Sequence, residues 1–193
     1  MTATRPEQLT LDKIDAPIGA FLIAVDESGV LRAVDFWADE ASLRQLLRRQ
    51  YGPVPVVAGR APAAIRQAFE TYFAGDIRAL EAVPVATVGT AFQRKVWAAL
   101  QRIPAGETRS YGQLAAEIGE PQASRAVGLA NGQNPIAIVI PCHRVIGADG
   151  SLTGFGGGLP RKRWLLRHEG AAFKENRKDV VKAAKLAQAE LAL

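Results

Sequence analysis

The stretch Ser110–Ala130, SYGQLAAEIGEPQASRAVGLA, predicts two short helices joined by a tight turn. Ser110 and Gln113 have the spacing of a capping box, in which each residue hydrogen-bonds the backbone of the other, so the first helix is expected to begin there. Gly119 is suited to ending this helix, and Pro121 to the first turn of the next one. Two helices joined in this way form a helix-turn-helix, a pattern that many DNA-binding proteins use and other helical pairs share.

The rest of the second half is expected to consist of short elements. Thr90 and Gln93 repeat the capping pattern, and the helix that they open should end at Pro104. The expected elements of this half are helices over residues 91–103, 111–118, 122–130 and 160–169, a buried strand over 136–140 and a glycine loop over 154–158.

The first half predicts a small α/β unit. Apolar and polar residues alternate on both sides of a turn at Asp26-Glu27-Ser28-Gly29, which indicates a β-hairpin over residues 17–37. The other expected elements are helices over 38–50 and 62–73, a strand over 54–58 and an extended segment over 80–88. We find no motif in this half that carries chemistry and expect it to act as a scaffold.

The charge divides the chain at the same place. Residues 1–88 hold 9 Lys and Arg against 11 Asp and Glu, whereas residues 89–193 hold 15 against 8. A basic second half suits contact with a polyanion such as nucleic acid, although a solvated basic surface has the same composition. We therefore expect a scaffold domain over 1–88, a functional domain over 89–170 and an appended lysine-rich tail over 171–193.

The composition excludes several classes of protein. A hydrophobic fraction of 48% is enough for a core, and no apolar run approaches the roughly 20 residues that span a bilayer. The first residues lack the apolar centre of a signal peptide. One cysteine forms no internal disulfide and is too few for a cysteine-based zinc site. These features predict a soluble, cytoplasmic protein without membrane contacts.

The single cysteine, Cys142, lies in the sequence IPCHRV. An isolated cysteine is most often an inert core thiol, but here Pro141 fixes the backbone, and His143 and Arg144 supply donors and charge that favour a thiolate. Neighbouring side chains of an extended segment point to opposite faces, so we expect His143 to reach the thiol through a water molecule. His168 is the alternative partner, and a carboxylate near His143 would orient its ring.

The sequence around Cys142 resembles the active-site signature of the O6-alkylguanine-DNA alkyltransferases. The resemblance covers about residues 88–170. Its motifs are VW at 96–97, IPAG at 103–106, SYG at 110–112, SRAVG at 124–128, NP at 134–135, IPCHRV at 140–145 and WLLRHEG at 164–170. It implies a ribonuclease-H-like N-terminal α/β domain and a helical C-terminal domain that binds DNA and transfers the alkyl group.

The resemblance also implies a chemistry for named residues. The protein would take an alkyl group from O6 of guanine, with Cys142 as the nucleophile. His143 would accept the thiol proton through water, and Glu169 would orient His143. Tyr111 would stabilise the leaving guanine, and Asn134 would tie the helix-turn-helix to the active-site strand. Because the cysteine is itself the acceptor, the reaction is irreversible and single-use, and it needs no cofactor.

The expected partner is double-stranded DNA that carries the lesion, bound by a monomer. The base must leave the duplex, and Arg125 matches the arginine that fills the gap in the base stack. The resemblance places this helix in the minor groove, which it can approach closely because its residues are small. The candidate contacts beside Arg125 are Ser124, Ala123, Ala126, Gly128 and Tyr111.

The substrate pocket is expected to contain Val145, Phe155 and Gly156. The backbone carbonyls of Cys142 and Val145 would recognise the exocyclic amine of guanine. Gly156 stands where many relatives carry a serine, and its glycine-rich loop suggests that alkyl groups larger than methyl are accepted. Some relatives bind a structural zinc ion in the first domain, but residues 1–141 contain neither cysteine nor histidine, so we expect no metal site.

Two other functions are compatible with a helix-turn-helix. One is a non-catalytic module that recognises alkylation damage, but such alkyltransferase-like proteins lack the cysteine. The other is a regulator that senses electrophiles through Cys142, which would need sequence-specific binding and usually a dimer. The sequence alone does not decide between O6-alkylguanine and O4-alkylthymine as the lesion.

Overall fold

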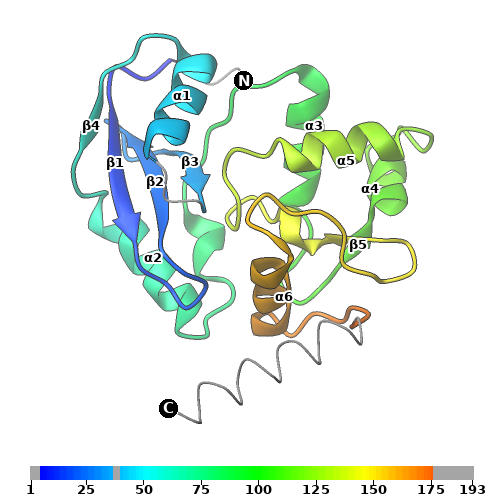
Figure 1. Cartoon of the computed structure of the whole chain (residues 1–193). Coiled ribbons are helices and arrows are strands. Elements are labelled where there is room, and N and C mark those ends of the chain that lie inside the picture. Colours follow the sequence, from blue (N-terminus) through cyan, green and yellow to red (C-terminus); the bar gives the residue numbers. More distant parts are fainter. Residues whose placement is uncertain (1–4, 37–39, 176–193) are drawn as a thin grey trace.

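The computed structural model describes residues 5–36 and 40–175 of the 193-residue chain (Figure 1). Its first half is a four-stranded sheet in the order β3-β2-β1-β4. The strands are β1 (Leu9–Ile14), β2 (Phe21–Asp26), β3 (Leu31–Asp35) and β4 (Val56–Ala58). β1 and β3 run antiparallel to β2, and β4 runs parallel to β1.

One helix covers each face of this sheet. The side chains of β2 alternate: Ile23 joins the core cluster that includes α2 (Ala63–Phe73), whereas Ala24 joins the cluster that includes α1 (Glu40–Tyr51). This alternation follows from the two-residue period of a strand. The first half is therefore an α/β unit, as predicted, and the structure arranges it in three layers.

The sequence prediction for the first half needs two corrections. β1 was not predicted, because the adjacent polar residues Asp12 and Lys13 interrupt the alternation that begins at Leu9. Residues 80–88 are not extended throughout, since the short 3₁₀ helix η1 spans Ala79–Ala82. The predicted hairpin and both helices are present, although residues 37–39 at their junction lie outside the described residues.

The second half is mainly helical, as predicted. Its elements are α3 (Ala91–Leu100), β5 (Arg109–Ser110), α4 (Tyr111–Glu117), α5 (Ser124–Gly132), η2 (Cys142–Arg144), β6 (Val145–Ile146) and α6 (Leu159–His168). Both capping boxes are present, at Thr90 and at Ser110. Gly119 has a φ of 75°, which explains why a glycine ends the turn after α4. Pro121 precedes α5 by three residues and does not lie in its first turn.

The segment before Cys142 is not the predicted strand. It turns back on itself: the Ile140 amide donates to the Ile136 carbonyl at 2.9 Å, and Ile138 has a φ of 72°. Cys142 then begins the 3₁₀ helix η2 and does not lie in an extended segment. An apolar run of five residues fits a strand or any other buried segment, so its composition did not determine its shape.

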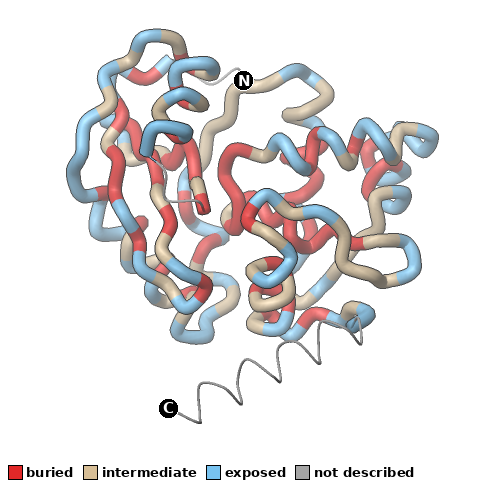
Figure 2. The backbone as a smooth tube through the Cα atoms, viewed as in Figure 1, coloured by how far each residue is buried: buried red, intermediate tan, exposed pale blue. Residues whose placement is uncertain are grey.

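A single core cluster joins the two halves. It extends from Phe21 and Phe69 in the first half to Trp97, Cys142 and Leu165 in the second. Figure 2 shows buried stretches in both halves. The cysteine segment is therefore packed in the middle of the molecule, and the proposed domain boundary at residue 88 stays a prediction.

Two further expectations concern membrane-spanning helices and the lysine-rich tail. Within residues 5–36 and 40–175, no helix combines the length and the apolarity that crossing a bilayer requires. Of the predicted tail, residues 171–175 are described, and Lys174 bridges to Ser151. Residues 176–193 lie outside the described residues.

Candidate active site

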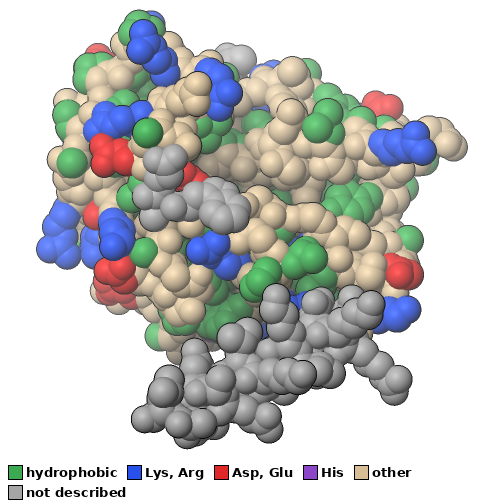
Figure 3. Space-filling model, in the orientation of Figure 1, with side chains coloured by type: hydrophobic (Ala, Val, Ile, Leu, Met, Phe, Trp, Pro, Cys, Tyr) green, Lys and Arg blue, Asp and Glu red, His purple; other side chains and the backbone are tan. Residues whose placement is uncertain are grey.

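Cys142 lines a cavity of about 440 Å³ to which both halves contribute. Six residues predicted for the site lie in its wall: Tyr111, Gly128, Asn134, Cys142, Phe155 and Gly156. The first half supplies Val34, Asp35, Phe36 and Leu46. Figure 3 shows Lys and Arg side chains scattered over one face of the molecule with acidic side chains among them, so the described residues form no continuous basic stripe on this face.

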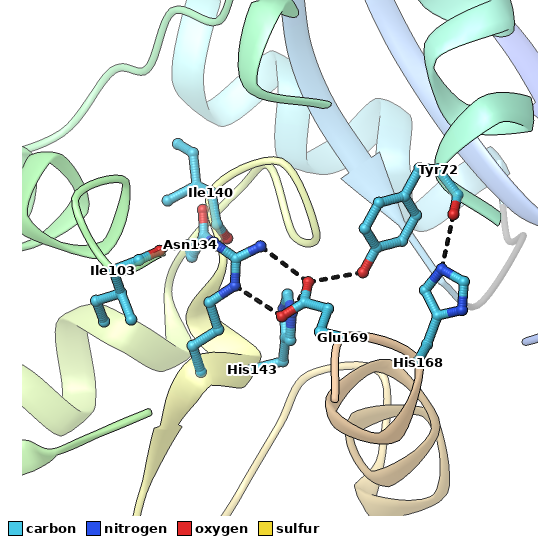
Figure 4. A network of polar contacts seen from close by, with 8 residues as sticks. Tyr72, Ile103, Asn134, Ile140, His143, His168 and Glu169 are labelled. Atoms are coloured by element: carbon cyan, nitrogen blue, oxygen red, sulfur yellow. Dashed lines mark hydrogen bonds and ion pairs between the residues drawn. The ribbon is translucent and has the colours of Figure 1, made fainter. Parts of the chain in front are cut away.

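Glu169 caps the C-terminal end of α6, is 3% exposed and accepts hydrogen bonds from two other elements, α2 and η2. Its Oε1 accepts from His143 Nε2 at 2.9 Å, Arg144 Nη2 at 2.8 Å and the Tyr72 hydroxyl at 2.8 Å (Figure 4). Its Oε2 accepts from Arg144 Nε at 2.8 Å. The structure thus brings the predicted His143 and Glu169 together and places Arg144 in a buried ion pair with the same carboxylate.

The bond to Glu169 determines the tautomer of His143. A carboxylate accepts hydrogen bonds, so Nε2 carries the proton and Nδ1 is the free acceptor. Nδ1 is buried and has no hydrogen-bond partner among the described residues. Burial lowers the pKa of His143, and Glu169 only partly opposes this shift, so the ring is neutral near pH 7. A neutral ring can accept a proton at Nδ1.

The Cys142 thiol is 5% exposed, and burial raises its pKa. Asn134 and Lys162 act in the opposite direction but do not outweigh burial. The expectation that His143 and Arg144 favour a thiolate over the thiol is therefore wrong for the resting protein, although the backbone of His143 also acts to lower the pKa of Cys142. The charge of Arg144 is already engaged by Glu169, and His143 is neutral, so neither offers the thiolate a free positive charge.

Asn134 connects the end of the helix-turn-helix to the cysteine segment. Its Nδ2 donates to the Ile140 carbonyl at 2.7 Å, and its Oδ1 accepts from the Ile136 amide at 3.0 Å. Asn131, which the sequence did not suggest, donates to the Cys142 carbonyl at 3.4 Å. Asn131, in the last turn of α5, and Asn134, just after this helix, therefore hold the turn from which Cys142 projects.

Lys162 is a second residue that was not predicted. It is fully buried, and its Nζ donates to the carbonyls of Val145 at 2.6 Å and Thr153 at 2.9 Å. Burial lowers the pKa of Lys162 to about 8. The basic residues on either side made it look like part of a solvated face. Helical spacing was the available signal, because Lys162 shares a face with Leu165 and Glu169.

The remaining pocket residues lie as follows. The Tyr111 hydroxyl is 3.0 Å from that of Thr153, and Gly128 lies against the Tyr111 ring. Gly156 is exposed, with open space where a Cβ would stand. Val145 is buried outside the cavity wall, and its carbonyl already accepts from Lys162.

The outer face of α5 is exposed and formed by small side chains around one arginine. Arg125 and Ala126 are exposed, and Ala123, Ser124 and Gly128 are half-buried. Leu129, not predicted as a contact, is 66% exposed one turn after Arg125. Among the described residues, no group of three metal-binding side chains lies close enough to hold an ion.

Comparisons with known proteins identify relatives over most of the chain. A family model described as the DNA-binding domain of 6-O-methylguanine DNA methyltransferase matches residues 91–171. The methylated-DNA–protein-cysteine methyltransferase of Salmonella typhimurium is 47% identical over 165 residues, which cover 84% of this chain and 96% of that protein. The protein of the same name from Methanosarcina acetivorans is 47% identical over 160 residues, covering 81% and 96%.

Solved structures have the same arrangement. Mycobacterium tuberculosis OGT in complex with DNA is 42% identical, with a TM-score of 0.68 over 84% of this chain and 92% of that one. The O6-methylguanine-DNA methyltransferase of Pyrococcus kodakaraensis, at 23% identity and a TM-score of 0.63, shares the fold over 84% of this chain and 99% of that one.

Glu169→Gln is expected to lower the free energy of unfolding by about 3–5 kcal/mol near pH 7, because it leaves the Arg144 charge buried without its partner. Burial alone would raise the pKa of Glu169, but His143 and Arg144 together hold that pKa well below its usual range. The carboxylate therefore stabilises the fold above the unfolded pKa of about 4.3, and this contribution is lost as the pH falls toward the folded pKa.

Chemical denaturation of wild type and Glu169→Gln across this pH range checks the prediction. The gap in stability should narrow as the pH falls below about 4.3. Glu120→Gln, which breaks the exposed pair with Lys95, is the matched control and should change stability by no more than about 1 kcal/mol. A gap that stays constant with pH would contradict the ionised state assigned to Glu169.

Proposed function

The chain belongs to the O6-methylguanine DNA methyltransferase family and is a methylated-DNA–protein-cysteine methyltransferase of DNA repair; on this basis we propose that Cys142 is the residue that accepts the alkyl group. One observation carries the proposal. The bond between His143 Nε2 and Glu169 leaves Nδ1 as a buried acceptor on the residue next to Cys142, whose thiol lines the cavity.

The reaction is a displacement at the alkyl carbon. Cys142 Sγ forms a bond to that carbon as its bond to O6 of guanine breaks, which leaves a thioether on the protein. The thiol proton passes through a water molecule to Nδ1 of His143, and Tyr111 supplies a hydrogen bond or proton to the leaving guanine. The thioether is stable, so each molecule reacts once.

Burial of the thiol supports a reaction that begins only when the lesion is bound. A thiol with a raised pKa stays protonated at rest and is protected from oxidation and from stray electrophiles. A flipped base that fills the cavity excludes bulk water and places the alkyl carbon beside Sγ, so that loss of the proton and attack on carbon occur together.

The side chains of α5 indicate how the chain contacts DNA. We infer that this helix enters the minor groove, where its small residues permit close approach, and that Arg125 occupies the gap left by the flipped base. The solved relative in complex with DNA supports binding to DNA in general. The specific partner proposed here is a duplex that carries O6-alkylguanine, bound by one protein molecule.

Intact-mass measurement tests the proposed acceptor. Mixed with a duplex that contains one O6-methylguanine, the wild type should gain a single methyl group per molecule, and Cys142→Ser should gain none. Circular dichroism verifies that the serine variant is folded. A methyl group on the serine variant, or more than one per wild-type molecule, would show that Cys142 is not the sole acceptor.

Arg125→Ala is expected to slow transfer from duplex DNA by about tenfold or more, because the cost of extruding a base is a few kcal/mol and the arginine offsets part of it. Transfer from the free base O6-benzylguanine, which needs no extrusion, should change by less than about twofold. Arg102→Ala removes an equal charge just after the end of α3, where Arg102 donates to the Ala98 carbonyl, and should leave both rates intact. Equal losses on both substrates would contradict the role in base flipping.

The glycine loop should allow alkyl groups larger than methyl, because the side of the cavity at Gly156 is open. We expect transfer rates for O6-benzylguanine and O6-methylguanine in the same duplex to agree within about tenfold, a difference of about 1.4 kcal/mol in the barrier. Gly156→Val should slow the benzyl reaction more than the methyl reaction. A wild-type rate that collapses for benzyl would refute the open pocket.

A further inference from the structure

The first half contributes a polar side chain to the proposed catalytic network. Given the proposed function, we propose that Tyr72 is a positioning residue of the alkyl transfer: its hydroxyl fixes the Glu169 carboxylate and limits how much of its charge acts on His143. The first half is then part of the proton-accepting machinery as well as a scaffold.

The geometry places Tyr72 directly on the shared oxygen. Tyr72 lies in the last turn of α2, is 1% exposed and donates its hydroxyl to Glu169 Oε1 at 2.8 Å. The same oxygen accepts from His143 Nε2 and from Arg144 Nη2 (Figure 4). The Tyr72 hydroxyl must be the donor, because an ionised carboxylate can only accept.

A second bond fixes the backbone of Tyr72. His168 Nε2 donates to the Tyr72 carbonyl at 2.6 Å, and the two rings meet edge to face at 5.0 Å. His168 is in turn stacked on Trp164 at 4.7 Å. Consecutive residues at the end of α6, His168 and Glu169, therefore hold Tyr72 at both its carbonyl and its hydroxyl. This double attachment leaves the phenol little freedom to leave the carboxylate.

Removing the Tyr72 hydroxyl should change the pKa of His143 in one direction. Three donors share the charge on Oε1, and removing Tyr72 leaves that charge to His143 and Arg144. The His143 imidazolium is then better stabilised, so the pKa of His143 rises. The other charged or titratable groups around the ring are Arg144, Lys162 and Cys142, and Tyr72→Phe alters none of them directly.

A rise in this pKa affects the reaction at low pH. His143 can accept the thiol proton only while it is neutral, so the rate falls as the pH drops through its pKa. Losing the Tyr72 hydroxyl should move this fall to higher pH. A tyrosine that only packs between the two halves would change stability and leave the position of this fall unchanged.

The chain has only two histidines, which makes the pKa directly measurable. Imidazole NMR titrations of wild type and Tyr72→Phe, assigned with His168→Gln, should show the His143 titration at higher pH in the Phe variant. Tyr51→Phe is the matched control, because it removes a buried hydroxyl that lies 3.5 Å from the Ala86 carbonyl and makes no contact with Glu169. An unchanged His143 titration in a folded Tyr72→Phe protein would overturn the proposal.

Alkyl-transfer rates provide a second readout. We expect Tyr72→Phe to slow transfer by about three- to tenfold near pH 6 and by less than about twofold near pH 8.5, because a rise of about one unit in the pKa of His143 lowers its neutral fraction by at most about tenfold. His168→Gln removes the ring contacts with Tyr72 and Trp164 but leaves the Tyr72 hydroxyl on Glu169, so it should lower the melting temperature without moving the pH profile. A uniform loss at every pH for Tyr72→Phe would indicate a merely structural role.

A second variant and a readout independent of alkyl transfer keep the role of Tyr72 testable. If Tyr72→Phe does not fold, 3-fluorotyrosine at position 72 retains the ring and makes the hydroxyl a stronger donor, so the His143 titration should move to lower pH; no movement would again overturn the proposal. The NMR titration needs no alkyl transfer. A failure of Cys142 to accept methyl would therefore refute the proposed function without deciding the role of Tyr72.

Discussion

A buried carboxylate is stable only when donors occupy its lone pairs, and Glu169 is such a carboxylate. Its donors come from α2 and from η2, and the carboxylate itself lies at the end of α6. Removing any one of these elements would leave a charge or a donor buried without a partner. This requirement holds the two halves in one relative position, and it also leaves His143 Nδ1 as the free nitrogen of the ring.

The same burial that protects the network shapes the reactivity of Cys142. A low-pKa thiolate would be reactive at all times, which is a hazard for a protein that can react only once. Here the thiol is kept protonated by its surroundings, while Asn134 and Lys162 offset part of the cost of ionisation. Lys162 also donates hydrogen bonds to the carbonyls of Val145 and Thr153. These two bonds fix both ends of the turn between those residues to α6.

Side-chain hydrogen bonds join the proposed DNA face directly to the proposed chemical centre. Asn131 lies in the last turn of α5 and bonds the Cys142 carbonyl, and Asn134, just after the helix, bonds the Ile140 carbonyl. A shift of α5 on DNA would therefore be transmitted to the turn that carries the cysteine. Such direct bonding explains why the cavity wall contains residues of α5, of this loop and of the glycine loop together.

The sequence by itself determined the local elements with strong signals: the capping boxes at Thr90 and Ser110, the glycine stop at Gly119 and the IPCHRV motif around Cys142. Contacts between residues distant in the chain were decided only by the tertiary structure. Tyr72 lies 97 residues from Glu169, and no local pattern marks it as different from a core tyrosine. The resting state of Cys142 was likewise mispredicted, because its sequence neighbours suggested a thiolate whereas the pKa depends on burial by the whole fold.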